Sequence, residues 1–384
     1  MTLPISPPVL PMLAAPVAAV PDQGDGDLEW DYEPKWDGFR AIVYRDGDDV
    51  RIDSRNARPM QRYFPEVVDA VKAALPDRCV VDGEIVIAQP GGTPGAAARL
   101  DFEALTLRIH PAASRVAMLA ASVPASLVVF DVLALGDDDL TGRPLRDRLV
   151  ALDSLHLTGP HVFATPRTTD ARVAREWFVQ FEGAGLDGVV AKRVDEGYQP
   201  DKRVMRKIKH ARTADVVLAG YRLHKTSTPD KPMLGSLLLG LYDDTGGLQF
   251  VGVAASFPAA RRVALIEELA DLVLTPGTGA HGEHPWADWE DFGPATVGEG
   301  GGRGRRPGAQ SRWSAGKDLS FTALRTERVL EVGYDHMEGT RFRHTAQFKR
   351  WRPDREPASC TFAQLEEPVS YDLAALLPGA PGTV

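Results

Sequence analysis

Lys35 is the residue of this sequence with the clearest capacity for covalent chemistry. A lysine acts as a nucleophile only when its amine is neutral, and burial or a nearby positive group promotes that state. The pattern Lys-x-Asp-Gly is weak by itself, because it should occur by chance in roughly one chain of this length in fifteen. Asp37-Gly38 could also form an ordinary surface turn. The segment that contains the lysine reads Glu33-Pro34-Lys35-Trp36-Asp37-Gly38-Phe39-Arg40.

Further charged residues follow beside apolar segments along the chain. A carboxylate next to a buried strand is costly unless it binds a metal, a sugar hydroxyl or a base. Two lysines that are two positions apart lie on one face of a strand. These features fit the same chemistry as a nucleophilic Lys35. The segments are Asp82-Gly83-Glu84, Phe130-Asp131, Asp187-Gly188-Val189-Val190-Ala191-Lys192, Lys207-Ile208-Lys209 and Arg352-Pro353-Asp354-Arg355.

The elements that must position these residues divide the chain into two parts. Residues 1–211, after a Pro-rich leader, mix strand and helix patterns and predict an α+β domain. The helix patterns have apolar residues at helical spacing, and the strand patterns are short runs rich in Val and Ile. The expected elements are a hairpin at 44–54, a helix at 64–75, strands at 79–87 and 127–133, helices near 145–152 and 173–181, and a strand at 188–191.

Residues 212–384 are expected to form a second domain made mostly of strands. One helix, expected at 262–274, interrupts the series, and such a pattern suits a small Greek-key barrel such as the OB-fold. A loop rich in Gly and Arg is expected near 297–312. His281 and His284 precede it, but two loop histidines without cysteines make a poor zinc site. The expected strands lie at 216–221, 236–242, 248–254, 328–334 and 342–351.

Composition limits the possible partners and compartments. The net charge of −9 argues weakly against nucleic acid, yet three basic runs favour a polyanion partner. Two cysteines are too few for a disulfide framework and suit a reducing cytoplasm. Prolines break the apolar stretch at 7–20, so neither a signal peptide nor a membrane span is expected. The basic runs contain Arg203, Arg206, Lys207, Lys209, His210 and Arg212; Arg303, Arg305 and Arg306; and Arg341, Arg343, Lys349, Arg350, Arg352 and Arg355.

Taken together and in this order, the motifs resemble those of the covalent nucleotidyltransferases, which include DNA ligases, RNA ligases and messenger-RNA capping enzymes. Within this superfamily the chain most resembles the bacterial ATP-dependent DNA ligases of the ligase C group. Residues 311–317, and residues 334–339 leading into 342–348, carry that closer resemblance. The family fold is an adenylation domain followed by an OB-fold domain. The resemblance therefore implies an enzyme that seals nicks between a 5′-phosphate and a 3′-hydroxyl in duplex DNA.

The resemblance also implies a role for each motif residue. Lys35 attacks the α-phosphorus of ATP and carries AMP, which passes to the nick phosphate before the 3′-hydroxyl displaces it. Mg²⁺ or Mn²⁺ is expected, bridging phosphate oxygens with help from Glu84 or Asp187. The implied nucleotide contacts are Glu33 with the adenine amino group, Glu84 with the ribose, Phe130 stacked on the base, Arg40 and Arg55 near the nucleotide and the nick phosphate, Lys207 and Lys209 on the α-phosphate, and Arg352, Asp354 and Arg355 on the leaving pyrophosphate.

Two positions depart from the family pattern. The motif that begins at Asp187 usually begins with Glu, so this carboxylate reaches about one methylene less far. The last motif usually ends in Lys, and here it ends in Arg355, which keeps the charge but changes the geometry.

Other functions remain open at this point. An RNA ligase or a capping-type guanylyltransferase would share Lys-x-Asp-Gly, and a DNA-end binding module without activity could keep the fold. For a ligase, the expected partner is nicked double-stranded DNA, with no membrane. We expect a monomeric, stand-alone cytoplasmic enzyme that serves DNA repair and relies on other repair proteins for end processing. Excision repair and break repair are not distinguished by these residues.

Overall fold

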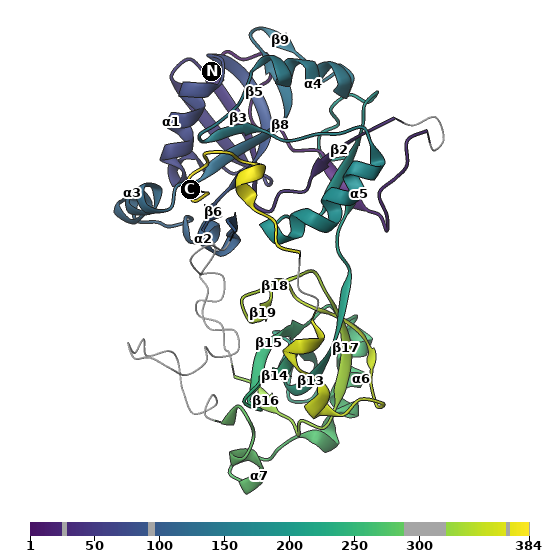
Figure 1. Ribbon diagram of the computed structural model, residues 1–384. Coiled ribbons are helices and arrows are strands. Elements are labelled where there is room, and N and C mark those ends of the chain that lie inside the picture. Colours follow the sequence, from purple (N-terminus) through teal and green to yellow (C-terminus); the bar gives the residue numbers. More distant parts are fainter. Residues whose placement is uncertain (25–28, 91–96, 288–319, 366–368, 384) are drawn as a thin grey trace. The chain divides into compact units, whose positions relative to one another are not determined.

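The computed structural model describes residues 1–24, 29–90, 97–287, 320–365 and 369–383. The chain folds into two compact units, which Figure 1 shows in ribbon form. Unit 1 comprises Met1–Lys209 together with Pro368–Val384, and unit 2 comprises His210–Glu367. No helix among the described residues is long and apolar enough to cross a membrane.

The larger sheet of unit 1 has apolar residues on both faces. Along β3, Ala41 and Val43 pack with the helices on one face, whereas Ile42 and Tyr44 pack with the N-terminal segment on the other. This alternation is the period of two that a strand imposes. The strand order is β10-β8-β5-β3-β4, with β9 paired to β8. The bounds are β3 Phe39–Asp46, β4 Asp49–Ser54, β5 Arg78–Val86, β8 Ser126–Leu135, β9 Asp138–Asp139 and β10 Val162–Ala164.

A second sheet of unit 1 contains the expected nucleophile segment and takes a strand from the leader. Its order is β1-β12-β11-β2, and β1 runs parallel to β12. The Pro-rich leader is thus part of the fold, because Leu3, Ile5 and Met12 are buried against the larger sheet. The bounds are β1 Leu13–Pro16, β2 Trp30–Pro34, β11 Val189–Arg193 and β12 Arg203–Ile208.

The described residues of unit 1 include five α-helices, of which α1, α4 and α5 pack against its sheets. α1 follows the expected apolar spacing, with Pro65 in its first turn and Val67 and Val71 buried. α5 packs on β2 and β11. The bounds are α1 Pro65–Ala74, α2 Phe102–Leu107, α3 Ala113–Ser122, α4 Leu145–Ser154 and α5 Ala171–Gln180, with the short strands β6 Ala88–Gln89 and β7 Arg99–Leu100 beside them.

The C-terminal segment belongs to unit 1, which corrects the expected second domain of 212–384. Leu373 and Leu377 are fully buried in the same apolar cluster as Trp36 and Phe130. Gly183 allows the segment to approach closely, because a Cβ built there would lie 1.9 Å from the carbonyl oxygen of Val369. These apolar residues therefore draw the chain back to unit 1, and the second domain ends before them.

Unit 2 is an OB-fold barrel around one apolar core. The sheet order is β15-β14-β13-β17-β20, with β16 paired to β13. A parallel bridge between Ala254 and Ala346 joins the two edges. The expected strand at 342–351 is split, and the helix expected at 262–274 is α6, which ends earlier. The bounds are β13 Arg212–Leu223, β14 Leu234–Tyr242, β15 Leu248–Ala254, α6 Ala259–Glu268, α7 Gly279–Gly282, β16 Thr322–Ala323, β17 Val329–Tyr334, β18 Met337–Glu338, β19 Arg341–Phe342 and β20 Gln347–Trp351.

Two other expectations for this unit concern a metal and a loop. His284 is buried, its Nε2 lies 3.0 Å from the carbonyl oxygen of Ala219, and its ring lies beside Trp286. Among the described residues, no group of three or more His, Cys, Asp or Glu could hold a metal ion. The expected Gly/Arg-rich loop at 297–312 lies outside the described residues.

Candidate active site

Lys35 lies directly after β2 and opposite the start of β11. Its backbone N–H donates to the carbonyl oxygen of Gly188 at 2.8 Å, and the backbone N–H of Asp187 donates to the carbonyl oxygen of Lys35 at 2.9 Å. Lys35 Nζ is 2.6 Å from Asp187 Oδ2, and Lys209 Nζ is 2.7 Å from the same oxygen. Three motifs that are far apart in the sequence therefore meet at one carboxylate.

Gly188 makes this convergence possible. Its φ of +122° lies where side chains are rarely tolerated, and a Cβ built there would lie 2.0 Å from the carbonyl oxygen of Ile208. The backbone of β12 can therefore approach the start of β11 closely. This approach brings Lys209, the residue after Ile208, to Asp187.

Positive charge collects around the two lysines. Burial alone would raise the pKa of Asp187, but Lys35 and Lys209 outweigh it and lower this pKa below its usual value. Burial lowers the pKa of Lys207, and the positive charges of Lys209, Lys35 and Arg55 lower it further. Asp187 offsets part of this positive charge, and the lowered pKa of Lys207 shows that the cluster remains electropositive, which suits a phosphate group.

Glu33 is buried on the same sheet, and among the described residues only one of its two carboxylate oxygens has a partner. Its Oε1 is 2.8 Å from Lys192 Nζ, and its buried Oε2 has no hydrogen-bond partner within the described part of the chain. Burial raises the pKa of Glu33 to about 7, although Lys192 opposes this effect. In the strand register Glu33 lies opposite Val190, which lies opposite Lys207, so Glu33 and Lys207 project from one face.

Arg40 and Glu84 lie opposite each other on β3 and β5. Burial raises the pKa of Glu84 to about 7, while Arg40 and then Lys35 oppose the rise. The Arg40 guanidinium donates from Nε and Nη2 to the two oxygens of Asp82 at 2.5 and 2.6 Å. Gly38 is needed beside them, because a Cβ there would lie 2.2 Å from the carbonyl oxygen of Ile85.

Phe130 is contacted by two cations. The Arg40 guanidinium carbon lies 4.4 Å and Lys192 Nζ lies 4.5 Å from the centre of its ring. Trp36 belongs to the same apolar cluster, and its indole Nε1 donates to Thr165 Oγ1 at 2.9 Å. Phe130 is only 4% exposed, so little of its ring is open to solvent.

Comparison with known proteins decides the family of this chain. Residues 11–209 match the family model described as the ATP dependent DNA ligase domain. DNA ligase C of Mycobacterium tuberculosis (strain ATCC 25618 / H37Rv) is 55% identical over 384 residues, which cover 99% of each chain. The chain belongs to the ATP-dependent DNA ligases. DNA ligase C2 of Mycolicibacterium smegmatis is 57% identical over 369 residues, covering 96% of this chain and 97% of the relative.

The comparisons also support the ligase fold and the ligase C group. A solved structure named Pmar-Lig_Pre has a TM-score of 0.51 and 16% identity, and covers 89% of this chain and 68% of that chain. The α+β adenylation domain followed by an OB-fold domain is thus confirmed as the architecture. Of the functions that the sequence left open, an ATP-dependent DNA ligase is the one that these relatives support, so the chain is an enzyme.

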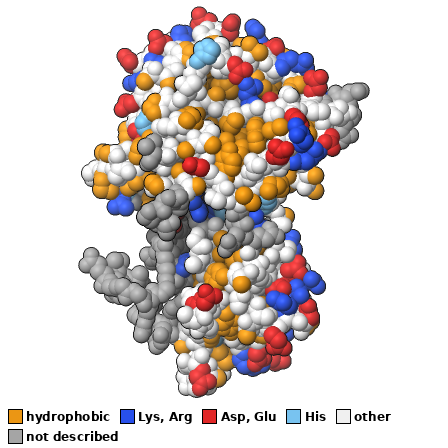
Figure 2. Space-filling model, viewed as in Figure 1, with side chains coloured by type: hydrophobic (Ala, Val, Ile, Leu, Met, Phe, Trp, Pro, Cys, Tyr) orange, Lys and Arg blue, Asp and Glu red, His pale blue; other side chains and the backbone are white. Residues whose placement is uncertain are grey.

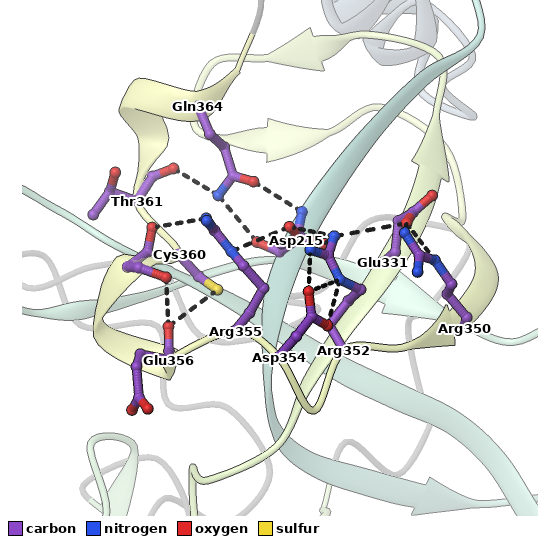
Figure 3. A network of polar contacts seen from close by, with 11 residues as sticks. Asp215, Glu331, Arg350, Arg352, Asp354, Arg355, Glu356, Cys360, Thr361 and Gln364 are labelled. Atoms are coloured by element: carbon purple, nitrogen blue, oxygen red, sulfur yellow. Dashed lines mark hydrogen bonds and ion pairs between the residues drawn. The ribbon is translucent and has the colours of Figure 1, made fainter.

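The last sequence motif of this ligase lies in unit 2 and is held there by carboxylates. Arg352 Nη1 lies 2.9 Å from both oxygens of Asp215, and Arg355 Nε lies 3.3 Å from Asp215 Oδ2. Arg352 Nη2 also donates to Asp354 Oδ2 at 2.7 Å. Figure 3 shows both arginines directed at Asp215, with Glu331 beside Arg352. Asp215 lies on β13, so the motif is fixed to the first strand of the barrel.

Arg55 follows β4 and is exposed. Over the visible face of the molecule in Figure 2, acidic and basic side chains are intermixed at the edges of both units. The net charge of −9 is a sum over the whole chain, whereas the positive charges of Lys209, Lys35 and Arg55 act together on Lys207.

Sequence reasoning gave no role to several buried polar residues around the site. Lys192 ends a recognised motif, and its contact with Glu33 could have been suspected from that position alone. Asp31 lies two positions before Glu33 on β2 and therefore on the same face of the strand, but this spacing is only a weak indication of a role in the site. Arg148 pairs with Asp131 through two hydrogen bonds of 2.8 and 2.9 Å. No signal in the sequence indicated this pair, because the two residues come from a helix and a strand.

Proposed function

We propose that this ligase seals nicks in duplex DNA by passing AMP through Lys35. The supporting observation is the convergence of Lys35 and Lys209 on Asp187, at 2.6 and 2.7 Å, next to a buried carboxylate of Glu33 with an unused oxygen. This arrangement supports a site in which Lys35 acts as the nucleophile, the neighbouring lysines bind phosphate and Glu33 accepts a hydrogen bond from the base.

In the first step, the lone pair of Lys35 Nζ forms a bond to the α-phosphorus of ATP. The bond from that phosphorus to the bridging oxygen breaks, pyrophosphate leaves, and Nζ loses its proton. An ammonium has no lone pair, so Lys35 must first give up a proton, either to Asp187 Oδ2 at 2.6 Å or to water. In the second step, a 5′-phosphate oxygen of DNA attacks the same phosphorus and releases the lysine. In the third, the 3′-hydroxyl attacks the DNA phosphorus and releases AMP.

The family resemblance assigns the nucleotide contacts, and the chemistry of each side chain is compatible with its assignment. Glu33 Oε2 is buried and can accept a hydrogen bond from the adenine amino group. Phe130 offers a ring to the base, and Glu84 can accept from a ribose hydroxyl. Lys207, Lys209, Arg40 and Arg55 neutralise charge on the α-phosphate and on the nick phosphate. Arg352, Asp354 and Arg355 are assigned to the leaving pyrophosphate on the family resemblance.

Glu84 and Asp187 are the carboxylates that would hold a divalent metal ion. Mg²⁺ is usually bound by one or two carboxylates, substrate phosphates and waters, so two carboxylates suffice. Glu84, with a pKa raised to about 7, gains its charged form when a cation approaches. When bound, Mg²⁺ or Mn²⁺ would neutralise charge on the phosphate oxygens. We further propose that the ligase acts as a monomer in DNA repair.

Intact-mass spectrometry of the protein after incubation with ATP and Mg²⁺ tests the nucleophile. We expect the mass of one added AMP on the native chain and on a Lys202→Ala control, which removes an exposed lysine before β12. Lys35→Ala should gain no mass. An AMP adduct that persisted in Lys35→Ala would contradict the assignment. Sealing of nicked DNA and of nicked RNA by the native protein then tests the proposed substrate.

A further inference from the structure

Two buried tyrosines of unit 1 hold the N-terminal segment in the same way. The hydroxyl of Tyr44 on β3 accepts from the backbone N–H of Val9 at 2.7 Å. The hydroxyl of Tyr198, in the loop between β11 and β12, accepts from the backbone N–H of Met12 at 3.1 Å. Both rings belong to the apolar cluster that contains Met12. As anchors for this segment the two tyrosines are therefore equivalent.

Tyr198 differs in what its hydroxyl donates to. It donates to Asp82 Oδ2 at 2.7 Å. Within the described part of the chain, the Tyr44 hydroxyl makes no hydrogen bond to a carboxylate. Asp82 is fully buried, and burial raises the pKa of Tyr198 well above its usual value. The Tyr198 hydroxyl thus keeps its proton and stays a donor at any pH where the enzyme is assayed.

Asp82 in turn fixes the guanidinium of Arg40. It accepts from Nε through Oδ1 at 2.5 Å and from Nη2 through Oδ2 at 2.6 Å. A bidentate pair makes the plane of the guanidinium follow the plane of the carboxylate. The Tyr198 hydroxyl shares Oδ2 with Arg40, so it resists rotation of that carboxylate. The guanidinium held in this way lies 4.4 Å from the centre of the Phe130 ring and opposite Glu84.

We propose that Tyr198 is a positioning residue for the adenylation step, and that it acts by orienting Arg40 through Asp82. This inference rests on the proposed function, in which Arg40, Phe130 and Glu84 bind the nucleotide. Within the described part of the chain, loss of the hydroxyl leaves Arg40 as the partner of the Asp82 carboxylate, so the carboxylate and the guanidinium gain freedom to turn. ATP must then order the arginine when it binds, and the cost of that ordering appears as weaker binding.

Tyr198→Phe and Tyr44→Phe form a matched pair for the test. Each removes one oxygen, keeps the ring and leaves one backbone N–H of the N-terminal segment without its partner. Self-adenylation should be measured by rapid quenching over a range of ATP concentrations, with urea unfolding of each variant alongside. We expect the apparent KM for ATP to rise roughly tenfold in Tyr198→Phe, because a hydrogen bond to a charged group is lost. Tyr44→Phe should stay within about twofold, since its hydroxyl does not contact Asp82.

Arg40→Met separates positioning from a general loss of structure. If Tyr198 acts only through Arg40, then Tyr198→Phe should cause no further change in kcat/KM when Arg40 is already methionine. Equal KM values for the two tyrosine variants, or effects of Tyr198→Phe and Arg40→Met that simply add, would overturn the inference. If the native protein formed no AMP adduct, the proposed function itself would fail, so the two failures are distinguishable.

Discussion

Replacing Asp31 with asparagine should change the stability of unit 1 by an amount that depends on pH. Asp31 lies on β2, two residues before Glu33 and on the same face of the strand. It is only 4% exposed, and its Oδ2 has no hydrogen-bond partner within the described residues. The nearest cation, Arg167 Nη1, is 4.0 Å from Oδ1. Burial therefore raises the pKa of Asp31 to about 6, against the partial compensation from Arg167 and Lys192.

The magnitude follows from that pKa. The folded protein binds the Asp31 proton more tightly than the unfolded chain, whose pKa is 3.8. The stabilising contribution is complete below the unfolded value and is lost as the pH rises through the folded value. The rise from 3.8 to about 6 corresponds to about 3 kcal/mol over the whole range, of which about 1 kcal/mol falls between pH 5 and pH 8. Asparagine does not titrate and avoids this loss.

Hydrogen exchange of peptides from β2 and β11 in urea, at pH 5 and pH 8, would give the free energy of unfolding for native protein and Asp31→Asn. The variant should gain about 1 kcal/mol relative to the native protein between the two pH values. Any fixed cost of burying the amide cancels in that comparison. Glu29→Gln, at an exposed position just before β2, is the control. A stability difference between Asp31→Asn and native protein that does not change with pH would refute the reasoning.

Four further changes test other parts of the structure. Gly188→Ala should slow AMP-adduct formation more than tenfold, because the new Cβ collides with the Ile208 carbonyl and moves β12 away. Mass spectrometry over time measures the rate of adduct formation, and circular dichroism checks that the variant is folded. Leu373→Ala should destabilise unit 1 by about 2–5 kcal/mol in urea unfolding. Arg148→Met should cost about 3–5 kcal/mol by leaving Asp131 buried without its partner, and Asp131→Asn in the same protein should recover part of this loss. Excess EDTA should abolish adduct formation, and added Mg²⁺ should restore it.

The order and type of most elements could be predicted because their signals are local. The apolar spacing of residues 64–75 predicts a helix, and α1 occupies Pro65–Ala74. The Val-rich runs at 79–87 and 127–133 correspond to the buried strands β5 and β8. In each case, one face or the whole segment is buried, so the local hydrophobic pattern is enough to identify the element as a helix or a strand.

Segments whose structure depends on a distant partner could not be predicted. The leader becomes β1 only because β12 offers it an edge to pair with. The C-terminal segment carries only a few apolar residues, and their partners in unit 1 are more than 170 positions away in the sequence. Neither segment has a periodic pattern of its own, so neither could be assigned from local signals.

For the site, the motifs identified residues but not their contacts. Lys35 and Asp187 are separated by 152 positions, and no spacing rule predicts that Lys209 should share the same carboxylate oxygen. The Arg40–Asp82 pair comes from adjacent strands, so strand pairing is needed before the contact can be seen. The roles assigned to these residues stay predictions, and the structure adds the contacts through which each can be tested.

The short carboxylate at position 187 and the glycine after it act as one feature. The family motif usually begins with Glu, whose side chain would reach about one methylene further. Here Asp187 meets both lysine amines at 2.6 and 2.7 Å, so its reach is sufficient. This geometry requires a glycine at position 188, because a Cβ built there would lie 2.0 Å from the carbonyl oxygen of Ile208. Gly188 thus lets β12 lie close enough for Lys209 to share this carboxylate with Lys35.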